Sequence, residues 1–257
     1  MHSHSLFLAY FILFIFGLGI LGLRAENSDK MMENQDQPVT LVELYSSEGC
    51  SSCPPAEAWI SRLKSDPRLW KQIVPVVFHV DYWDGLGWPD RFARKAFTER
   101  QSQYQASWGS GTVYTPEFIV SGREWHAWFD GDALPLEKTA PAGKLRLLIH
   151  SNGAGMQATY SPATKQSLSG LELHVAWLGM NITSDVQRGE NSGHQLLHDF
   201  VVLDFQTKTL NSANDGVFTT EISAPSFKGD HPAALAAWVT SQDGIPLQTV
   251  GGWLAQD

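Results

Sequence analysis

Cysteine is almost absent from this chain, which has Cys50 and Cys53 and no others among its 257 residues. A structural zinc site is disfavoured, because it takes four ligands and there is no second cysteine pair. His79 and His126 could complete a Cys2His2 set, or a softer copper site, only if the fold brings them beside the cysteines. A structural disulfide remains the plain alternative, although so small a loop stabilises the fold by only about 2 kcal/mol.

Blocks of basic residues are also missing. The chain has 18 Lys and Arg against 27 Asp and Glu, for a net charge of −9. Neither nucleic acid nor an anionic membrane surface is therefore an expected partner. There is no internal repeat and no low-complexity tract, and the length suits one large domain or two ordinary ones.

The longest apolar run is Leu6–Leu23, close to the N-terminus. It predicts a signal peptide over residues 1–25, cleaved after Ala25. Its 18 residues also reach the lower limit for a membrane span, so an uncleaved N-terminal anchor is the alternative. In both cases the protein would be secreted or periplasmic, in an oxidising compartment. The polar residues 26–37 that follow predict a disordered tether.

The two cysteines lie between an apolar run that is typical of a strand, Val39–Tyr45, and a run that is typical of a helix, Pro54–Leu63. A cysteine pair at such a turn is the arrangement of a dithiol redox site. The N-terminus of the helix favours the thiolate, which is the form that attacks a disulfide.

The rest of the first half predicts further strands and one long helix. Ile73–Val80 is continuously apolar, as a strand buried on both faces should be, and a helix follows over about Asp90–Trp108. Val113–Val120 and Arg123–Trp128 predict a hairpin. We expect parallel pairing for the first two strands and antiparallel pairing in the hairpin. Arg100 falls on the apolar arc of the long helix, where it either extends along the core edge or meets a buried partner such as Glu43 or Asp81.

The pattern changes after the Ala, Pro and Gly-rich segment 130–143. Short alternating segments without a long helix predict a β-sandwich of immunoglobulin-like type over residues 144–257. The expected strands are Leu145–His150, Gln157–Tyr160, Leu171–Trp177, Leu196–Phe205, Val217–Ile222, Ala234–Thr240 and Leu247–Trp253. Glu190, His194, His198 and Asp199 form a polar cluster there, which we interpret as a solvated turn rather than a metal site.

Several motifs resemble one family. They are Gly49–Pro55, Phe78–Trp83, Leu86–Trp88 and Val113–Pro116 in the first half and Gly189–Asn191 in the second. Together they resemble the thioredoxin superfamily and, more narrowly, the secreted thioredoxin-like family called domain of unknown function 1223. The resemblance implies an α/β thioredoxin-like domain over residues 38–140, ahead of the β-sandwich.

The resemblance also implies roles for individual residues. Cys50 would be the exposed attacking thiol, and Cys53 the resolving thiol that releases the mixed disulfide. The Thr115–Pro116 bond would be cis and would pack against the cysteine turn, leaving the Thr115 backbone free to pair with an extended substrate. An ordinary trans proline at the start of a strand is the alternative.

Glu43 is the candidate buried acid that would manage protons for Cys53. It lies one residue further from the cysteines than the acid of thioredoxin, and such a shift turns a strand side chain to the other face. His79, Asp81 and Trp83 share one face of an extended segment and could line a substrate cleft beside Cys50. Trp88 and Tyr114 are further cleft candidates. These residues could equally be a polar strand end under an aromatic lid.

The sequence therefore predicts an exported thiol–disulfide oxidoreductase that uses Cys50 and Cys53 and needs no other cofactor. Its partners would be a protein or small-molecule disulfide or dithiol, and a second protein that recycles the pair. The alternative is a non-enzymatic binding module, for example for copper delivery, that uses the cysteines with His79 or His126.

Overall fold

The computed structural model describes residues 28–35, 37–136, 142–164, 168–225, 227 and 229–254. The predicted signal peptide or anchor lies outside these residues. Among the described residues, no helix is long and apolar enough to cross a membrane. The elements in chain order are β1 Lys30–Glu33, β2 Thr40–Ser46, α1 Pro54–Ser61, η1 Arg62–Ser65, β3 Ile73–His79, η2 Asp84–Leu86, α2 Lys95–Ser107, β4 Glu117–Val120, β5 Arg123–Glu124, β6 Lys144–Ile149, β7 Met156–Ser161, β8 Glu172–Gly179, β9 Ile182–Asp185, β10 Gln195–His198, β11 Val201–Thr209, β12 Asn211–Ser212, η3 Asn214–Gly216, β13 Phe218–Ile222, β14 Ala234–Thr240 and β15 Pro246–Trp253.

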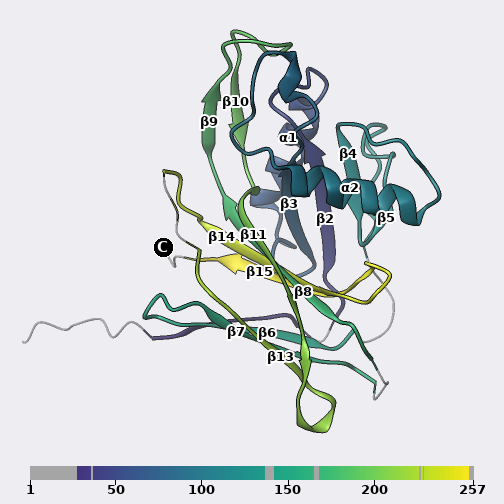
Figure 1. Cartoon of the computed structure of the whole chain (residues 1–257), viewed down its shortest axis with the longest axis vertical. Helices are drawn as coiled ribbons and strands as arrows, with labels where there is room; N and C mark the ends of the chain where they lie inside the picture. The colour runs from purple at the N-terminus through teal and green to yellow at the C-terminus, as the bar shows by residue number, and fades with distance from the viewer. Residues whose placement is uncertain are drawn as a thin grey trace, which may run out of the picture.

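A large mixed sheet organises the molecule (Figure 1). Its strand order is β15-β14-β8-β11-β3-β2-β4-β5, so it takes strands from both halves of the chain. The predicted fold class, an α/β thioredoxin-like domain followed by an immunoglobulin-like sandwich, is therefore wrong. The described part of the chain is mostly β-structure, and α1 and α2 are its α-helices.

The two halves join at β3. Val77 of β3 pairs in parallel with Val201 of β11, and the Val77 N–H donates to the carbonyl of Phe200 at 2.9 Å. Without β11, this apolar strand would be an edge with unpaired backbone groups. Pairing with a strand from the second half removes that edge, which explains why the two halves do not form separate sheets.

A second sheet, of order β1-β6-β7-β13-β12, packs against the first in the lower part of Figure 1. Strand β8 is buried on both faces: Val175 and Trp177 belong to the core between the two sheets, whereas Ala176 and Leu178 belong to the core that contains β2 and β3. Strand β1 pairs with β6, so Lys30–Glu33 form a strand within the segment that we predicted to be a disordered tether.

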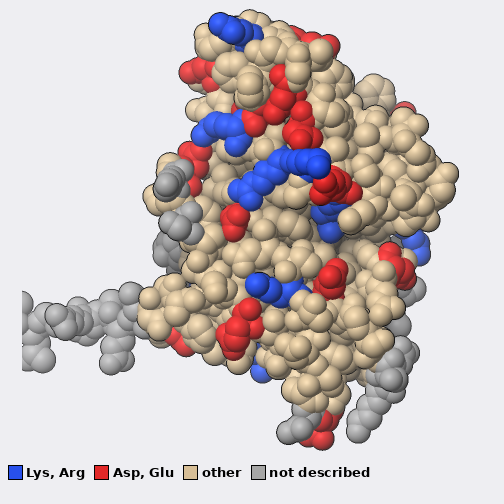
Figure 2. Space-filling model, in the orientation of Figure 1, with Lys and Arg blue, Asp and Glu red and all other residues tan. Residues whose placement is uncertain are grey.

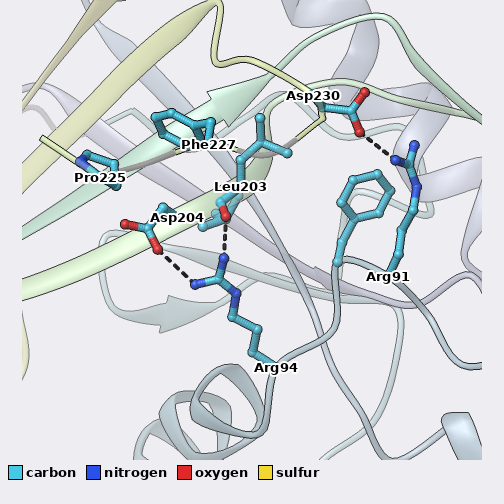
Figure 3. Close-up of a pocket in the computed structure, with 9 residues that line it drawn as sticks. Arg91, Arg94, Leu203, Asp204, Pro225, Phe227 and Asp230 are labelled. Carbon is cyan, nitrogen blue, oxygen red and sulfur yellow. Dashed lines mark hydrogen bonds and ion pairs between the residues drawn. The ribbon is translucent and has the colours of Figure 1, made fainter.

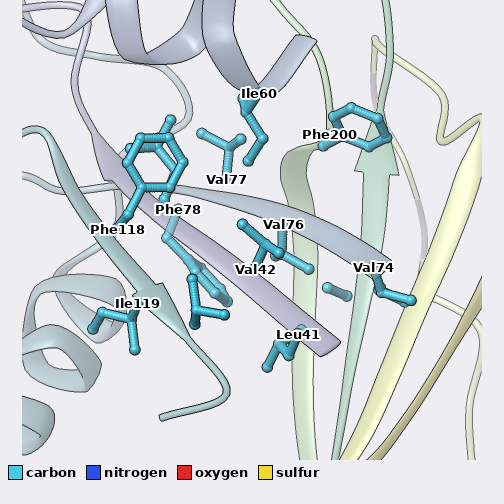
Figure 4. Close-up of a cluster of buried hydrophobic side chains, with 14 of the residues drawn as sticks. Leu41, Val42, Ile60, Val74, Val76, Val77, Phe78, Phe118, Ile119 and Phe200 are labelled. Atoms are coloured by element: carbon cyan, nitrogen blue, oxygen red, sulfur yellow. The ribbon is translucent and has the colours of Figure 1, made fainter. Parts of the chain in front are cut away.

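The core around β2 and β3 is made of branched and aromatic side chains (Figure 4). Strand alternation separates its two faces. Glu43 of β2 contacts Arg100 of α2, whereas Ser46 contacts Glu57 of α1. The two helices therefore cover opposite faces of these strands, and α1 is the helix that directly follows the cysteines.

Most of the predicted elements are present, with different boundaries. The expected parallel pairing of β2 with β3 and the hairpin of β4 with β5 are confirmed. Helix α2 begins at Lys95, since Arg94 is still extended with φ −140° and ψ 138°. The predicted strand Leu196–Phe205 is divided into β10 and β11, because Phe200 has a positive φ of 57° that a strand cannot continue through.

Candidate functional site

Cys50 and Cys53 form a disulfide at the N-terminus of α1. The turn before the helix is held by backbone hydrogen bonds, from Cys50 N–H to the Ser47 carbonyl and from Cys53 N–H to the Cys50 carbonyl, each 3.2 Å. Pro54 and Pro55 occupy the first turn of the helix, where missing N–H groups cost nothing. The local strand, turn and helix around the cysteines are therefore as predicted.

Both cysteines are fully buried, with no exposed surface on either residue. The Thr115 carbonyl oxygen lies 3.8 Å from Cys50 Sγ, and the Ser52 hydroxyl lies 3.3 Å from the same sulfur. Ser51 and Ser52 themselves are exposed. The expectation that Cys50 is an exposed thiol is wrong for this disulfide form, and a reagent reaches the sulfur only if its surroundings open.

The loop between β9 and β10 covers the cysteine turn. The Asn191 side-chain amide donates to the carbonyls of Glu48 and Cys50, at 2.9 Å each. The Glu190 carboxylate accepts from the Ser51 hydroxyl at 2.7 Å and from the Ser51 N–H at 3.1 Å. In Figure 1 the β9–β10 hairpin stands beside α1. Access to the disulfide therefore depends on a segment about 140 residues further along the chain.

The Thr115–Pro116 peptide bond is cis, which confirms that expectation. The Trp83 indole donates to the Thr115 hydroxyl at 2.8 Å, and the Trp88 indole donates to Glu48 at 2.6 Å. A Cβ added to Gly49 would lie 2.9 Å from Trp83 Cβ, so the indole segment packs tightly on the cysteine turn. Two of the predicted cleft residues, Trp83 and Trp88, thus lie around this turn.

Other predicted cleft residues have their recorded contacts elsewhere. Asp81 accepts a hydrogen bond of 2.6 Å from Thr98 of α2. The Tyr114 hydroxyl donates to Glu124, and its ring stacks on exposed His126.

Glu43 is not placed to serve Cys53. Its carboxylate binds Arg100 through Nε and Nη2 at 3.0 Å each, and accepts from the Tyr104 hydroxyl at 2.7 Å and the Tyr45 hydroxyl at 3.2 Å. These groups lie on the α2 face of the sheet, opposite the cysteine helix. The one-residue shift in the strand thus turned Glu43 away from the site, and Arg100 has the buried partner that was one of its two alternatives.

His79 lies on the α1 face, inside a cluster of buried charged side chains rather than in a cleft. We call Glu48, Glu57, His79, Asp90 and His198 the histidine–carboxylate cluster. Nδ1 of His79 lies 2.6 Å from Asp90, and Nδ1 of His198 lies 2.6 Å from Glu57. The remaining Nε2 atoms face Glu57 at 3.6 Å and Glu48 at 3.2 Å. Each imidazole therefore lies between two carboxylates.

Burial and charge act in opposite directions on this cluster. Burial alone would lower the pKa of His198, but the carboxylates of Glu57 and Glu48 outweigh it and raise that pKa to about 10. His79 likewise has a raised pKa, since Asp90 and Glu57 outweigh its burial. Burial would raise the pKa of Asp90, but His79 and two backbone N–H groups hold it at about 2.

The interpretation of the polar cluster in the second half as a solvated turn is wrong in part. His198 and Asp199 are buried, and Asp199 pairs with Lys64 at 2.7 Å, whereas Glu190 and His194 are exposed. Sequence reasoning also missed Glu57. The signal was there: Glu57 follows Cys53, the N-cap residue of α1, by four positions, which places it about one helical turn beyond the cysteine on the same side.

Two surface cavities lie near these elements. One, of about 340 Å³, is lined by Pro54, Glu57 and Ala58 of α1 and by Gln195–Leu197. The other, of about 580 Å³, lies between Arg94 and Phe227 (Figure 3). Its basic side chains are already paired, Arg94 with Asp204 at 3.0 Å and Arg91 with Asp230. The same interspersion of basic and acidic side chains is seen on the face in Figure 2.

The fold and the site define a mixed-sheet protein with a buried Cys–x–x–Cys disulfide at a helix N-terminus. Residues 41–240 match the family described as protein of unknown function (DUF1223), so the chain belongs to that family. A search of curated proteins found no match.

Two solved structures are similar to this chain. One is a crystal structure of a protein from Agrobacterium tumefaciens, 22% identical with a TM-score of 0.55, which covers 87% of this chain and 98% of that one. The other is HBP35 of Porphyromonas gingivalis, 18% identical with a TM-score of 0.56, which covers 86% of this chain and 76% of that one. At these identities the likeness concerns the fold alone.

Proposed function

We propose that the protein is a thiol–disulfide oxidoreductase that uses Cys50 and Cys53 by the dithiol chemistry of the thioredoxin superfamily. The observation that supports this most is the position of the pair: a disulfide at the N-terminus of α1, with the Thr115 carbonyl 3.8 Å from Cys50 Sγ. A helix N-terminus stabilises a thiolate.

In the reduced form, the Cys50 thiolate attacks one sulfur of a substrate disulfide and releases the other as a thiolate. The Cys53 thiolate then attacks Cys50 Sγ, which forms the Cys50–Cys53 disulfide and releases the second substrate thiolate. Two electrons pass from the protein to the substrate, and an external dithiol returns them. With a dithiol substrate the same steps run in reverse. The substrate is a protein or small-molecule disulfide or dithiol.

Both directions can be tested with the mature protein. Insulin reduction with glutathione as electron donor measures the reductase activity. Oxidation of a reduced, unfolded substrate protein measures the oxidase activity. We expect turnover above the background in one direction, its loss in Cys50→Ser, and a stable mixed disulfide on Cys50 in Cys53→Ser. Turnover that equals the background in both directions, or that survives Cys50→Ser, would overturn the proposal.

A second candidate follows from one observation, the complete burial of both cysteines. Buried, unreactive cysteines are typical of structural disulfides, and the protein would then be a non-enzymatic binding module. The copper version of this candidate has less support. Within the described chain, the side chains close enough together to hold a metal ion are Glu57, His79 and His198, which include neither cysteine and not His126.

Export is part of the proposal. It is supported by the apolar run Leu6–Leu23 and by a disulfide, which persists in oxidising compartments. The intact mass of the protein recovered from cells tests it. A chain that starts at Glu26 is the expected product, a membrane-bound chain that keeps residues 1–25 indicates the N-terminal anchor, and a soluble chain that keeps them contradicts export.

A further inference from the structure

We propose that Glu57, His79 and His198 form a binding site for one divalent transition-metal ion, and that Zn²⁺ fits these ligands best. One ligand atom from each residue lies within 4.8 Å of the other two, and all three residues are buried. Imidazole and carboxylate groups are common zinc ligands, and a set of two histidines and one glutamate is one of its known combinations. This site is separate from the proposed redox chemistry and does not depend on it.

The unpartnered ring nitrogen of His79 is the first observation that carries the proposal. Nε2 of His79 is buried without a hydrogen-bond partner within the described structure, whereas Nε2 of His198 lies 3.2 Å from Oε1 of Glu48. A buried polar atom without a partner costs about 1–3 kcal/mol, so the His79 nitrogen needs an explanation. Nε2 of His79 lies 3.6 Å from Oε1 of Glu57. Two ligands of a tetrahedral zinc ion are about 3.3 Å apart for bonds of about 2.0–2.1 Å, so this separation suits a shared ion.

The carboxylates around the histidines are the second observation. A histidine that binds a metal usually gives its other ring N–H to a carboxylate, which orients the ring. Asp90 lies 2.6 Å from Nδ1 of His79 and leaves Nε2 to the metal. His198 would bind the metal through Nδ1, which lies 2.6 Å from Glu57 in this structure. Glu48, 3.2 Å from Nε2, would then orient the His198 ring. Ser46 donates to Glu57 and fixes the third ligand.

The charge of the cluster permits a divalent cation. The recorded ion pairs of Glu48, Glu57 and Asp90 are with the two histidines. Three carboxylates and two fully protonated imidazoles sum to −1, so the histidines alone do not neutralise the cluster. A divalent ion that replaces the two protons leaves this sum unchanged, because each ligand histidine must be neutral.

A surface cavity borders the site. Glu57 lines this cavity of about 340 Å³ between α1 and β10, and His198 is the last residue of β10. The Glu57 side chain is 8% exposed, whereas those of His79 and His198 have no exposed surface, so Glu57 is the most exposed of the three ligands.

Metal content tests the proposal directly. Untagged mature protein is unfolded in urea with a chelator, dialysed, refolded with Zn²⁺, passed through a desalting column and analysed by mass spectrometry for zinc. We expect one equivalent in the wild type, in the exposed-histidine control His126→Gln and in the Cys50→Ser/Cys53→Ser double variant. His79→Gln and His198→Gln should hold less than a tenth of an equivalent.

Asp90, which orients His79, gives a milder variant. Asp90→Asn keeps all three ligands and should weaken zinc binding about 10–100-fold.

Co²⁺ in the wild-type protein should give the spectrum of nitrogen and oxygen ligands without a thiolate charge-transfer band. That spectrum is measured on the wild type, so the test stands even if a histidine variant does not fold. Wild-type protein without bound zinc, or folded His79→Gln and His198→Gln that keep a full equivalent, would overturn the proposal and leave the cluster as a chain of buried ion pairs.

Discussion

The ion pair between Glu43 and Arg100 gives the sharpest prediction about stability, and it also separates stability from chemistry. The Glu43 side chain has no exposed surface, and that of Arg100 is 12% exposed. The guanidinium lies over the rings of Tyr104 and Trp238, each 5.2 Å from their centroids. Burial would lower the pKa of Arg100, but the Glu43 charge raises it well above its usual value.

The substitution Glu43→Gln keeps the shape of the side chain and removes its charge. Arg100 stays a cation, since a guanidinium is not deprotonated in proteins, and it remains buried without its counter-ion. Breaking a buried pair in this way costs about 3–5 kcal/mol. For a chain of this size that corresponds to a fall in Tm of about 6–20 °C. Urea unfolding at pH 7 measures the loss, and the double variant Glu43→Leu/Arg100→Leu is the matched control that should recover most of it.

The same variant tests whether Glu43 serves the cysteines. Because Glu43 lies on the α2 face, Glu43→Gln should leave the reduction potential of the Cys50–Cys53 pair within about 30 mV of the wild type, which is about 1.4 kcal/mol. A larger shift in potential together with a loss of stability below about 1 kcal/mol would refute our reasoning and restore Glu43 as the proton-managing acid.

Three further predictions concern the surroundings of the site. Burial raises the pKa of Glu117 to about 7, so the folded state binds more protons than the unfolded state between about pH 4.5 and 7, and stability falls as the pH rises through this range. Glu117→Gln should remove this dependence, worth at most about 3 kcal/mol, in unfolding curves at pH 5 and 8. Gly49→Ala should cost about 1–3 kcal/mol in urea unfolding, because the new Cβ would lie 2.9 Å from Trp83 Cβ. Asn191→Ala should speed reduction of the disulfide by dithiothreitol about tenfold, because two hydrogen bonds that cover Cys50 are lost.

Each of these has a result that would contradict it. Equal pH dependence in Glu117→Gln and the wild type would mean that this carboxyl is not protonated near neutral pH. An unchanged urea midpoint for Gly49→Ala would mean that Trp83 moves away freely. An unchanged reduction rate for Asn191→Ala would mean that the β9–β10 loop does not control access to Cys50.

Local patterns predicted the cysteine turn well. The apolar strand, the proline-started helix and the parallel pairing of β2 with β3 all follow from hydrophobic periodicity over a dozen residues. The fold class was missed because it depends on which distant strand closes the edge of β3. Every residue of β3, Ile73–His79, is buried. Its sequence therefore does not show whether the strand beside it comes from the same half of the chain or is β11.

The site was predicted in part for a similar reason. Cys50, Cys53 and the Thr115–Pro116 bond belong to short motifs that can be recognised without a structure. Glu190 and Asn191 also belong to a recognisable motif, but they reach the turn from about 140 residues away, and no periodicity connects them to it. His198 appeared as part of a polar turn, because its burial depends on the packing of β10 against α1.

The central claim is that Cys50 and Cys53 form a working redox couple, and their reduction potential tests it most directly. Equilibrium titration of the mature protein in glutathione or dithiothreitol buffers gives the value. Our account predicts a potential between about −120 and −270 mV, the range of known oxidoreductases. A potential well below about −300 mV would mean an inert structural disulfide and would contradict the account.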